Sequence, residues 1–264
     1  MEPVVTRRVE EGISFIALNR PDKRNAVDDA VLAGLAEQFL AAEADPETNA
    51  IVLHGEGRGF SAGIDFQSFL GSSAEGLAHP TRLRSFVSRA QGVLNTIERI
   101  EKPVIGALHR FVIGLGLEIA LACDLRVAAE DCELSLPETR IGLIPDVGGT
   151  TRLTRVVGYA RAKEMILTAR AVPAAEAERM GLVNAVAPAG EHLAAAKRLA
   201  GEIGKNAPLA VGLAKKIIDR GHGLDKMTFM ELEALAQSIL VRTEDFIEGA
   251  TALAERREPR FKGR

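Results

Sequence analysis

Two glutamates stand in surroundings that could give a carboxylate a chemical task. Glu118 is the only charged residue in the apolar stretch 111–123, and Glu138 follows twenty positions later. A carboxylate in an apolar segment is costly unless it has a partner or a function. Two carboxylates in different surroundings can divide the work of an acid and a base between them. The pair is therefore the first candidate for proton transfer.

Glycines near Glu118 suggest a second element of a site. Gly114-Leu-Gly116 opens an expected helix, whose first backbone N–H groups have no partner within it. Leu115 lies three residues before Glu118, so the two share a helix face. The glycine-rich loop 57–63, just before an expected helix near Ile64, could supply another N–H group. Two converging N–H groups would bind a negatively charged oxygen, although ordinary glycine turns explain the same pattern equally well.

Two other motifs in these segments have less support. Gly59-Phe-Ser-Ala-Gly63 matches the G-x-S-x-G nucleophile elbow of hydrolases, but a serine triad would need His192 or His222, and no motif supports either. Gly114-Leu-Gly116 could begin a dinucleotide site, but Ile119 stands where the third glycine belongs. Acid–base chemistry therefore remains the stronger hypothesis.

Strand, loop and helix patterns alternate over the first two thirds of the chain, which predicts an α/β fold. The sequence favours strands at 4–10, 13–19, 50–54, 103–108 and 125–129, and helices at about 28–43, up to 99 and at 114–123. Residues 71–80 are typical of a mobile loop.

Beyond about residue 153 the pattern is helical. Helices are expected at 161–168, 174–181, 191–203, 208–219, 225–241 and 244–256. We therefore predict a core at residues 1–195 and a C-terminal helical region at 196–264, joined somewhere near 190–205.

Composition limits the possible partners. With 264 residues, a net charge of −3 and no Trp, the chain has no nucleic-acid footprint. Cys123 and Cys132 match no metal-ligand spacing, so we expect no metal site. The N-terminus has no signal-peptide pattern, and the longest apolar run is too short to cross a bilayer. These features predict a cytoplasmic protein without a membrane segment.

The order of these motifs resembles the crotonase family of enoyl-CoA hydratases and isomerases. The matching pieces cover nearly the whole chain: Asn19-Arg-Pro-Asp-Lys-Arg-Asn-Ala26, Gly59-Phe-Ser-Ala-Gly-Ile-Asp65, Gly114-Leu-Gly-Leu-Glu-Ile-Ala-Leu-Ala-Cys-Asp124, Pro137-Glu138, Ile141-Gly-Leu-Ile-Pro-Asp-Val-Gly-Gly-Thr150 and Phe261-Lys-Gly263.

The resemblance implies a spiral of ββα turns, with C-terminal helices that mediate a homotrimer or a hexamer made of two trimers. It implies an acyl-CoA thioester as substrate, no separate cofactor, and an oxyanion hole made by two backbone N–H groups. The implied donors are Ile64 and Leu115, where many family members have glycine at the second position. The implied substrate-binding residues are Lys23, Arg24, Ala26, Ala62, Ile64, Asp65, Leu115 and Lys262.

The resemblance also implies catalytic roles. Glu118 and Glu138 match the two glutamates of the hydratases, which add water syn across the double bond of a 2-enoyl-CoA. Asp146 matches an aspartate of dienoyl-CoA isomerases, so a double-bond isomerase that uses Glu138 and Asp146 is the alternative. Asp146 is equally well explained as the cap of a loop. A non-catalytic, RNA-binding relative is disfavoured by the net charge.

Overall fold

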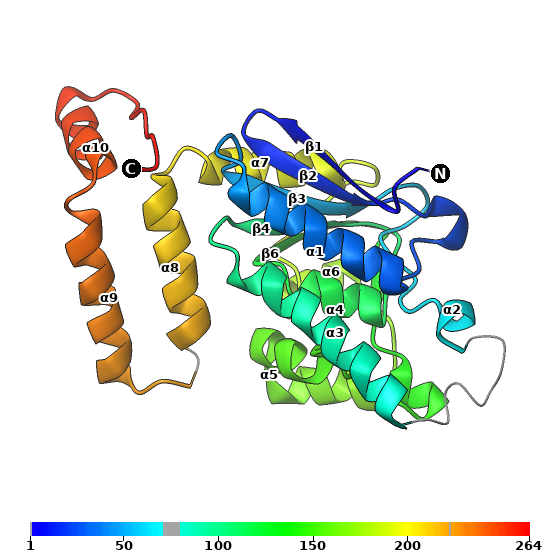
Figure 1. Cartoon of the computed structure of the whole chain (residues 1–264). Coiled ribbons are helices and arrows are strands. Elements are labelled where there is room, and N and C mark those ends of the chain that lie inside the picture. The colour runs from blue at the N-terminus through cyan, green and yellow to red at the C-terminus, as the bar shows by residue number, and fades with distance from the viewer. Residues whose placement is uncertain (1, 71–79, 222) are drawn as a thin grey trace.

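A six-stranded sheet in the order β1-β2-β3-β4-β6-β9 forms the centre of the molecule (Figure 1). The computed structural model describes residues 2–70, 80–221 and 223–264, so the loop expected at 71–80 lies almost wholly outside the described residues. β1 (Val5–Glu10) and β2 (Ile13–Leu18) form an antiparallel hairpin. Glu11 and Gly12 between them both have positive φ, as a two-residue hairpin turn requires.

The other strands of this sheet run parallel to β2. They are β3 (Ala50–Gly55), β4 (Val104–Leu108), β6 (Leu125–Ala129) and β9 (Ala185–Ala187). Helices α1 (Asp29–Ala44) and α3 (Pro80–Arg99) lie on one face, and α7 (His192–Ile203) lies on the other. Because both faces are covered, these strands are almost continuously apolar. The alternate residues of β3 enter the two opposite core clusters.

A smaller sheet lies beside the first. It joins β5 (Phe111–Ile113), β7 (Glu133–Ser135) and β8 (Val172–Pro173), and α6 (Ala174–Arg179) follows β8 directly. The sequence pattern did not predict β5, β7, β8 or β9. Each has two or three residues, and strands this short show no periodicity.

Helix α7 crosses the division expected at residues 195/196 and ends within the range near 190–205 expected for the join. It buries Ala196 and Ala200 against the sheet, in a cluster with side chains of β2, β3, β4 and β6. The division at 195/196 falls inside this helix, which cannot be separated from the sheet without exposing that cluster. The packing therefore places the end of the core after Ile203.

Three C-terminal helices form an arm that projects from the core (Figure 1). They are α8 (Pro208–Gly221), α9 (Lys226–Leu240) and α10 (Glu244–Glu255). The ion pair between Lys215 Nζ and Asp124 Oδ2, at 2.8 Å, attaches α8 to the core. Among the described residues, no helix has the length and apolar character needed to cross a membrane.

Candidate active site

Two loops expected to supply N–H donors lie side by side. The 60–64 segment pairs with the 111–115 segment through a parallel bridge between Ser61 and Val112. The approach is close, because a Cβ placed on Gly63 would lie 3.4 Å from Leu115 N and 2.6 Å from Ile113 O. Within the described residues, the N–H groups of Ile64 and Leu115 donate to no protein acceptor. Two N–H groups so placed can donate hydrogen bonds to the oxygen of a ligand.

Ser61 has a structural position in this loop. It is fully buried, and its Oγ donates to Asn25 O at 2.8 Å and accepts from Gly63 N at 3.2 Å. A hydroxyl held in this way is not presented to a substrate. The G-x-S-x-G match is therefore part of the loop architecture and not a nucleophile elbow.

Glu118 lies on α4 (Leu115–Leu121) and is 2% exposed. Its Oε1 accepts two backbone hydrogen bonds, from Val147 N at 2.8 Å and from Gly149 N at 2.7 Å. Gly149 is the first residue of α5 (Gly149–Thr168), so the carboxylate occupies a helix N-terminus. Burial raises the pKa of Glu118 to about 7, against the opposite effect of the Gly149 and Val147 N–H groups.

Glu138 has a different environment, at the start of the short helix η3 (Glu138–Ile141). Its Oε2 is buried and has no hydrogen-bond partner among the described residues. Burial raises the pKa of Glu138, and the nearby charge of Asp146 adds to the effect. A Cβ on Gly114 would lie 2.7 Å from Glu138 Oε1, so the glycine gives this carboxylate its room. Glu118 therefore accepts two backbone hydrogen bonds, whereas the buried Oε2 of Glu138 accepts none among the described residues.

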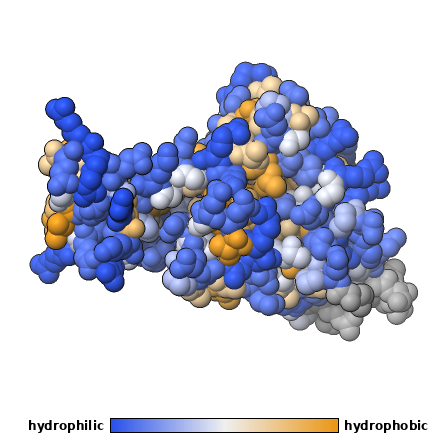
Figure 2. Space-filling view, turned by 90° about the horizontal axis from the view of Figure 1, so that it is seen from above, coloured by the Kyte–Doolittle hydropathy of each residue, from blue (hydrophilic) through white to orange (hydrophobic). Residues whose placement is uncertain are grey.

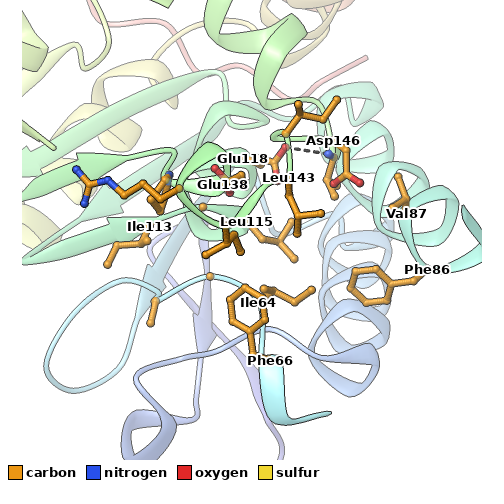
Figure 3. A pocket seen from close by; sticks show the side chains of 18 of the residues that line it. Ile64, Phe66, Phe86, Val87, Ile113, Leu115, Glu118, Glu138, Leu143 and Asp146 are labelled. Atoms are coloured by element: carbon orange, nitrogen blue, oxygen red, sulfur yellow. Dashed lines mark hydrogen bonds between the residues drawn. The ribbon is translucent and has the colours of Figure 1, made fainter. Parts of the chain in front are cut away.

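Both carboxylates face a cavity of about 280 Å³ whose walls are mainly apolar (Figure 3). The apolar side chains come from α2 (Phe66–Leu70), α3, the strand ends and the 141–147 loop. The labelled wall residues include Phe66, Phe86, Val87, Ile113 and Leu143. Ala62, Ile64 and Leu115 also line the cavity.

Asp146 lies at the same cavity, and burial raises its pKa. Its carbonyl oxygen accepts a hydrogen bond of 2.6 Å from Gln91 Nε2 on α3. The structure thus brings Glu118, Glu138 and Asp146 to one cavity.

The basic segment near the N-terminus lies next to the cavity rim. Arg24 O accepts a hydrogen bond of 3.0 Å from Ala62 N, and Ala26 is followed by a bridge between Val27 and Ile64. The Lys23 side chain is 55% exposed and lies 3.6 Å from Asp65 Oδ2. Lys23, Arg24 and Ala26 are therefore adjacent to the expected site without lining its cavity.

Asp65 and Lys262 differ from the other expected binding residues. Asp65 lies between Ile64 and Phe66, which line the cavity, but it does not line the cavity itself. This is expected because alternate residues of an extended segment point in opposite directions. It is 6% exposed and pairs with Arg20 Nη2 at 3.1 Å. Lys262 lies in the C-terminal arm, where its N–H donates to Asp245 Oδ1 at 2.7 Å. Neither lines the cavity of the single chain.

Sequence reasoning missed the donors to Glu118 and the walls of the cavity. Val147 and Gly149 lie 29 and 31 residues from Glu118, in a segment noted for its glycines. The pair Gly148-Gly149 could have indicated these donors, because glycine at a helix start allows another group to approach the backbone closely.

The fold and the site define an α/β enzyme of the enoyl-CoA hydratase type. A crystal structure of an enoyl-CoA hydratase from Bacillus anthracis matches with a TM-score of 0.93 and 34% identity, covering 99% of this chain and 100% of that one. The ββα fold class with its helical C-terminal region is thereby confirmed.

More specifically, the family model for enoyl-CoA hydratase/isomerase matches residues 8–264, and the chain belongs to this family, within the crotonase superfamily. The human enoyl-CoA hydratase domain-containing protein 2, mitochondrial, is 39% identical over 260 residues, which cover 97% of this chain and 87% of that protein. A crotonyl-CoA hydratase from Syntrophomonas wolfei is 36% identical over 253 residues, covering 96% and 95%.

Proposed function

We propose that this protein is an enoyl-CoA hydratase, which adds water syn across the double bond of a 2-enoyl-CoA thioester. The observation that carries this proposal is the position of Glu118 and Glu138 at one apolar cavity, beside two N–H groups without protein acceptors. The apolar walls suit an acyl chain, and relatives named as hydratases of crotonyl-CoA and short-chain enoyl-CoA support the reaction.

The thioester carbonyl binds with its oxygen between the N–H groups of Ile64 and Leu115. As water attacks C3, negative charge moves onto this oxygen and gives an enolate. Donors that are already oriented stabilise this charge without reorganisation, and the loss of one such donor typically raises the barrier by about 2.7–4 kcal/mol. Leu115 contributes its backbone to this oxyanion hole and its side chain to the acyl pocket.

The two glutamates hold the attacking water and divide the proton transfers. Glu118 acts as the base: burial raises its pKa to about 7, near the working pH, and the two N–H groups that donate to its Oε1 favour the charged form against that burial. Glu138 acts as the acid, because burial without a donor at Oε2 favours the neutral form. The water proton passes to Glu118 as oxygen bonds to C3, and the Glu138 proton passes to C2. In this mechanism both glutamates act on the same face of the double bond, so the addition is syn.

Hydration of crotonyl-CoA tests the proposal. The reaction is monitored by the decrease in the absorbance of the conjugated enoyl thioester. Glu118→Gln and Glu138→Gln keep the shape of the site but remove proton transfer, so we expect each to lower kcat by about 10²–10⁴-fold. Glu164→Gln, at an ion pair on α5, serves as the control and keeps its activity. Undiminished activity in either active-site variant would reject the assigned roles.

Double-bond isomerisation is the second candidate function, and Asp146 at the cavity favours it. Glu138 and Asp146 would move a proton between C2 and a more distant carbon through the same enolate, without water addition. Incubation with 3-enoyl-CoA and dienoyl-CoA esters in deuterated water separates the two reactions. Migration of the double bond with deuterium incorporation supports isomerisation, and its loss in Asp146→Asn assigns the role.

The CoA moiety binds at the rim of the cavity. Lys23 and Arg24 provide positive charge beside Ala26 and Ala62, where phosphate groups of the ligand can bind. Asp65 supports this edge through its ion pairs with Arg20 and Lys23. Replacing Lys23 by alanine should raise KM more than it lowers kcat.

The C-terminal arm joins several copies of the chain into a trimer or a hexamer. Apolar side chains are exposed on α9 and α10, among them Met227, Leu235, Ile239, Ile247 and Leu253. Figure 2 shows hydrophobic surface at the outer end of the arm. Lys262 is bonded to Asp245 of this arm, and the C-terminus, two residues further on, lies on the opposite side of the molecule from α2 (Figure 1). For Lys262 to contact CoA, it must therefore come from a second copy. Light scattering of the purified protein measures the number of copies.

A further inference from the structure

Arg152 is a buried cation next to the active site, although it does not line the cavity. It lies on α5 and is 7% exposed. Its Nε donates to Glu98 Oε1 at 2.7 Å, and its Nη2 donates both to Glu98 Oε2 and to Asn95 Oδ1 at 2.8 Å. A buried guanidinium is costly unless its donors are used, and here the bidentate pair with Glu98 uses two N–H groups in the most favourable geometry.

The remaining contact of Arg152 leads to Glu118. Arg152 Nη1 donates to Val147 O at 2.9 Å. The backbone N–H of Val147 in turn donates to Glu118 Oε1 at 2.8 Å. Val147 is thus held at its carbonyl by the cation and presents its N–H to the carboxylate. A Cβ on Gly148 would overlap the Arg152 guanidinium, so that glycine leaves the room for this contact.

One face of α3 supports the whole loop. Gln91, Asn95 and Glu98 are spaced at i, i+4 and i+7, which places them on one side of the helix. Gln91 binds the carbonyl of Asp146, and the other two bind Arg152. The loop that carries the donors to Glu118 is therefore attached to α3 at both of these points.

We propose that Arg152, held by Glu98 and Asn95, is a positioning residue for the reaction. It holds the 146–149 loop so that the N–H groups of Val147 and Gly149 stay on the Glu118 carboxylate. The proposal rests on the role of Glu118 as the base in the proposed function. A planar guanidinium reaches Glu98, Asn95 and Val147 at once, whereas the ammonium of a lysine is a point donor that cannot span them.

The consequence is a defined change in the ionisation of Glu118. Its two N–H donors favour the charged form, so a displaced loop raises the pKa of Glu118 further. A hydrogen bond to a charged group corresponds to about one unit of pKa. The acidic limb of the pH profile of kcat should therefore move upward by about one pH unit, and kcat at pH 7 should fall about fivefold, as the ionised fraction of Glu118 falls. KM should change little, because Arg152 does not line the cavity.

Arg152→Lys and Glu98→Gln are the test variants, since both preserve much of the packing. The matched control is Arg170→Lys. Arg170 makes a comparable network with Glu164 and Glu176 but does not contact the cavity or its loop. We expect a lower Tm in all three variants, and a shifted pH profile in Arg152→Lys and Glu98→Gln alone. An unshifted profile in Arg152→Lys, with only a lower Tm, would show a purely structural role and overturn the proposal.

A readout that does not depend on activity separates this proposal from the proposed function. The Glu118 carboxyl can be titrated by carbon NMR in ¹³C-glutamate-labelled protein and assigned by the signal lost in Glu118→Gln. A higher pKa in Arg152→Lys than in the wild type supports the positioning role even if crotonyl-CoA is not hydrated. An unchanged titration refutes it even if the wild type is a hydratase.

Discussion

The backbone N–H of Gly149 donates to Oε1 of Glu118 at 2.7 Å, and a Cβ on Gly149 would lie 2.9 Å from the same oxygen. The absence of a side chain thus allows a helix N-terminus to approach a buried carboxylate. Two effects oppose each other at this contact. Burial favours the neutral acid, and the N–H groups favour the carboxylate, which leaves the group able to change its protonation state near neutral pH.

Gly149→Ala should damage the site more than the fold. The added Cβ would lie 2.5 Å from Pro145 Cβ as well as near Glu118 Oε1, so the loop must shift. Displacement of a catalytic group by about 1 Å can cost about a hundredfold in rate. We expect kcat to fall by at least tenfold, measured on crotonyl-CoA. Gly201→Ala, in α7 with nothing within 4 Å of the new Cβ, is the control and should keep full activity. Equal kcat values for the two variants would contradict this account.

Glu118→Gln should lower activity strongly and still stabilise the folded protein at alkaline pH. Because the pKa of Glu118 rises from 4.5 in the unfolded chain to about 7 on folding, the folded state binds more protons between these values. Stability is therefore lost as pH rises from about 4.5 to 7. The neutral glutamine avoids this loss, so at pH 8 the variant should gain about 1–3 kcal/mol in the free energy of unfolding. Urea unfolding at pH 4 and pH 8 measures the difference, which should vanish at pH 4.

The pH profile of kcat should be bell-shaped. The active pair holds one proton, because Glu118 must be ionised and Glu138 protonated. One limb reports the ionisation of Glu118, whose pKa burial raises to about 7, and the other that of Glu138, whose pKa burial raises above its ordinary value. The two apparent values belong to the coupled pair rather than to either residue. A profile that is flat between pH 5 and pH 9 would be incompatible with this mechanism.

A pair of histidines that does not line the cavity should limit stability in acid. The rings of His109 and His192 are stacked with centroids 4.4 Å apart, and the Nδ1 atoms of both are buried without a partner among the described residues. Burial, reinforced by His109, lowers the pKa of His192 to about 4. The unfolded chain therefore binds an extra proton between about pH 6.5 and pH 4, and stability is lost as pH falls through this window.

His192→Phe removes that proton and keeps a ring to stack on His109. Its Tm should exceed that of the wild type at pH 5 by a few degrees, since about 1 kcal/mol corresponds to about 2–4 °C in a chain of this size. At pH 8 the two proteins should differ less. A larger difference at pH 8 than at pH 5 would exclude proton binding as the cause.

The sequence predicted those helices and strands whose capping residues and hydrophobic spacing lie within the element itself. α1 begins after Asp28, whose side chain accepts from Val31 N, and its buried residues follow the helical spacing seen in the sequence. The end of the core was not predictable in this way. α7 has the amphipathic pattern of any surface helix, and only its packing on the sheet assigns it to the core.

The candidate site likewise has features that the local sequence predicted and features that only packing decided. Glu118 and Leu115 share a helix face because the helical repeat places them there. Asp65 was expected at the cleft together with Ala62, but the extended segment turns it toward Arg20. Which side of a segment faces a cavity depends on the segments that pack against it.

The sequence by itself determined the two glutamates, the glycines that let other groups approach them, and the apolar helix that makes Glu118 costly to leave unpartnered. Tertiary structure decided which groups hold them. Val147 and Gly149 reach Glu118 from about thirty residues away, and Arg152 joins their loop to α3. Local backbone preferences act over a few residues, whereas these contacts exist only once distant segments pack together. The difference in donors between Glu118 and Glu138, on which the division into base and acid depends, therefore arises from the fold.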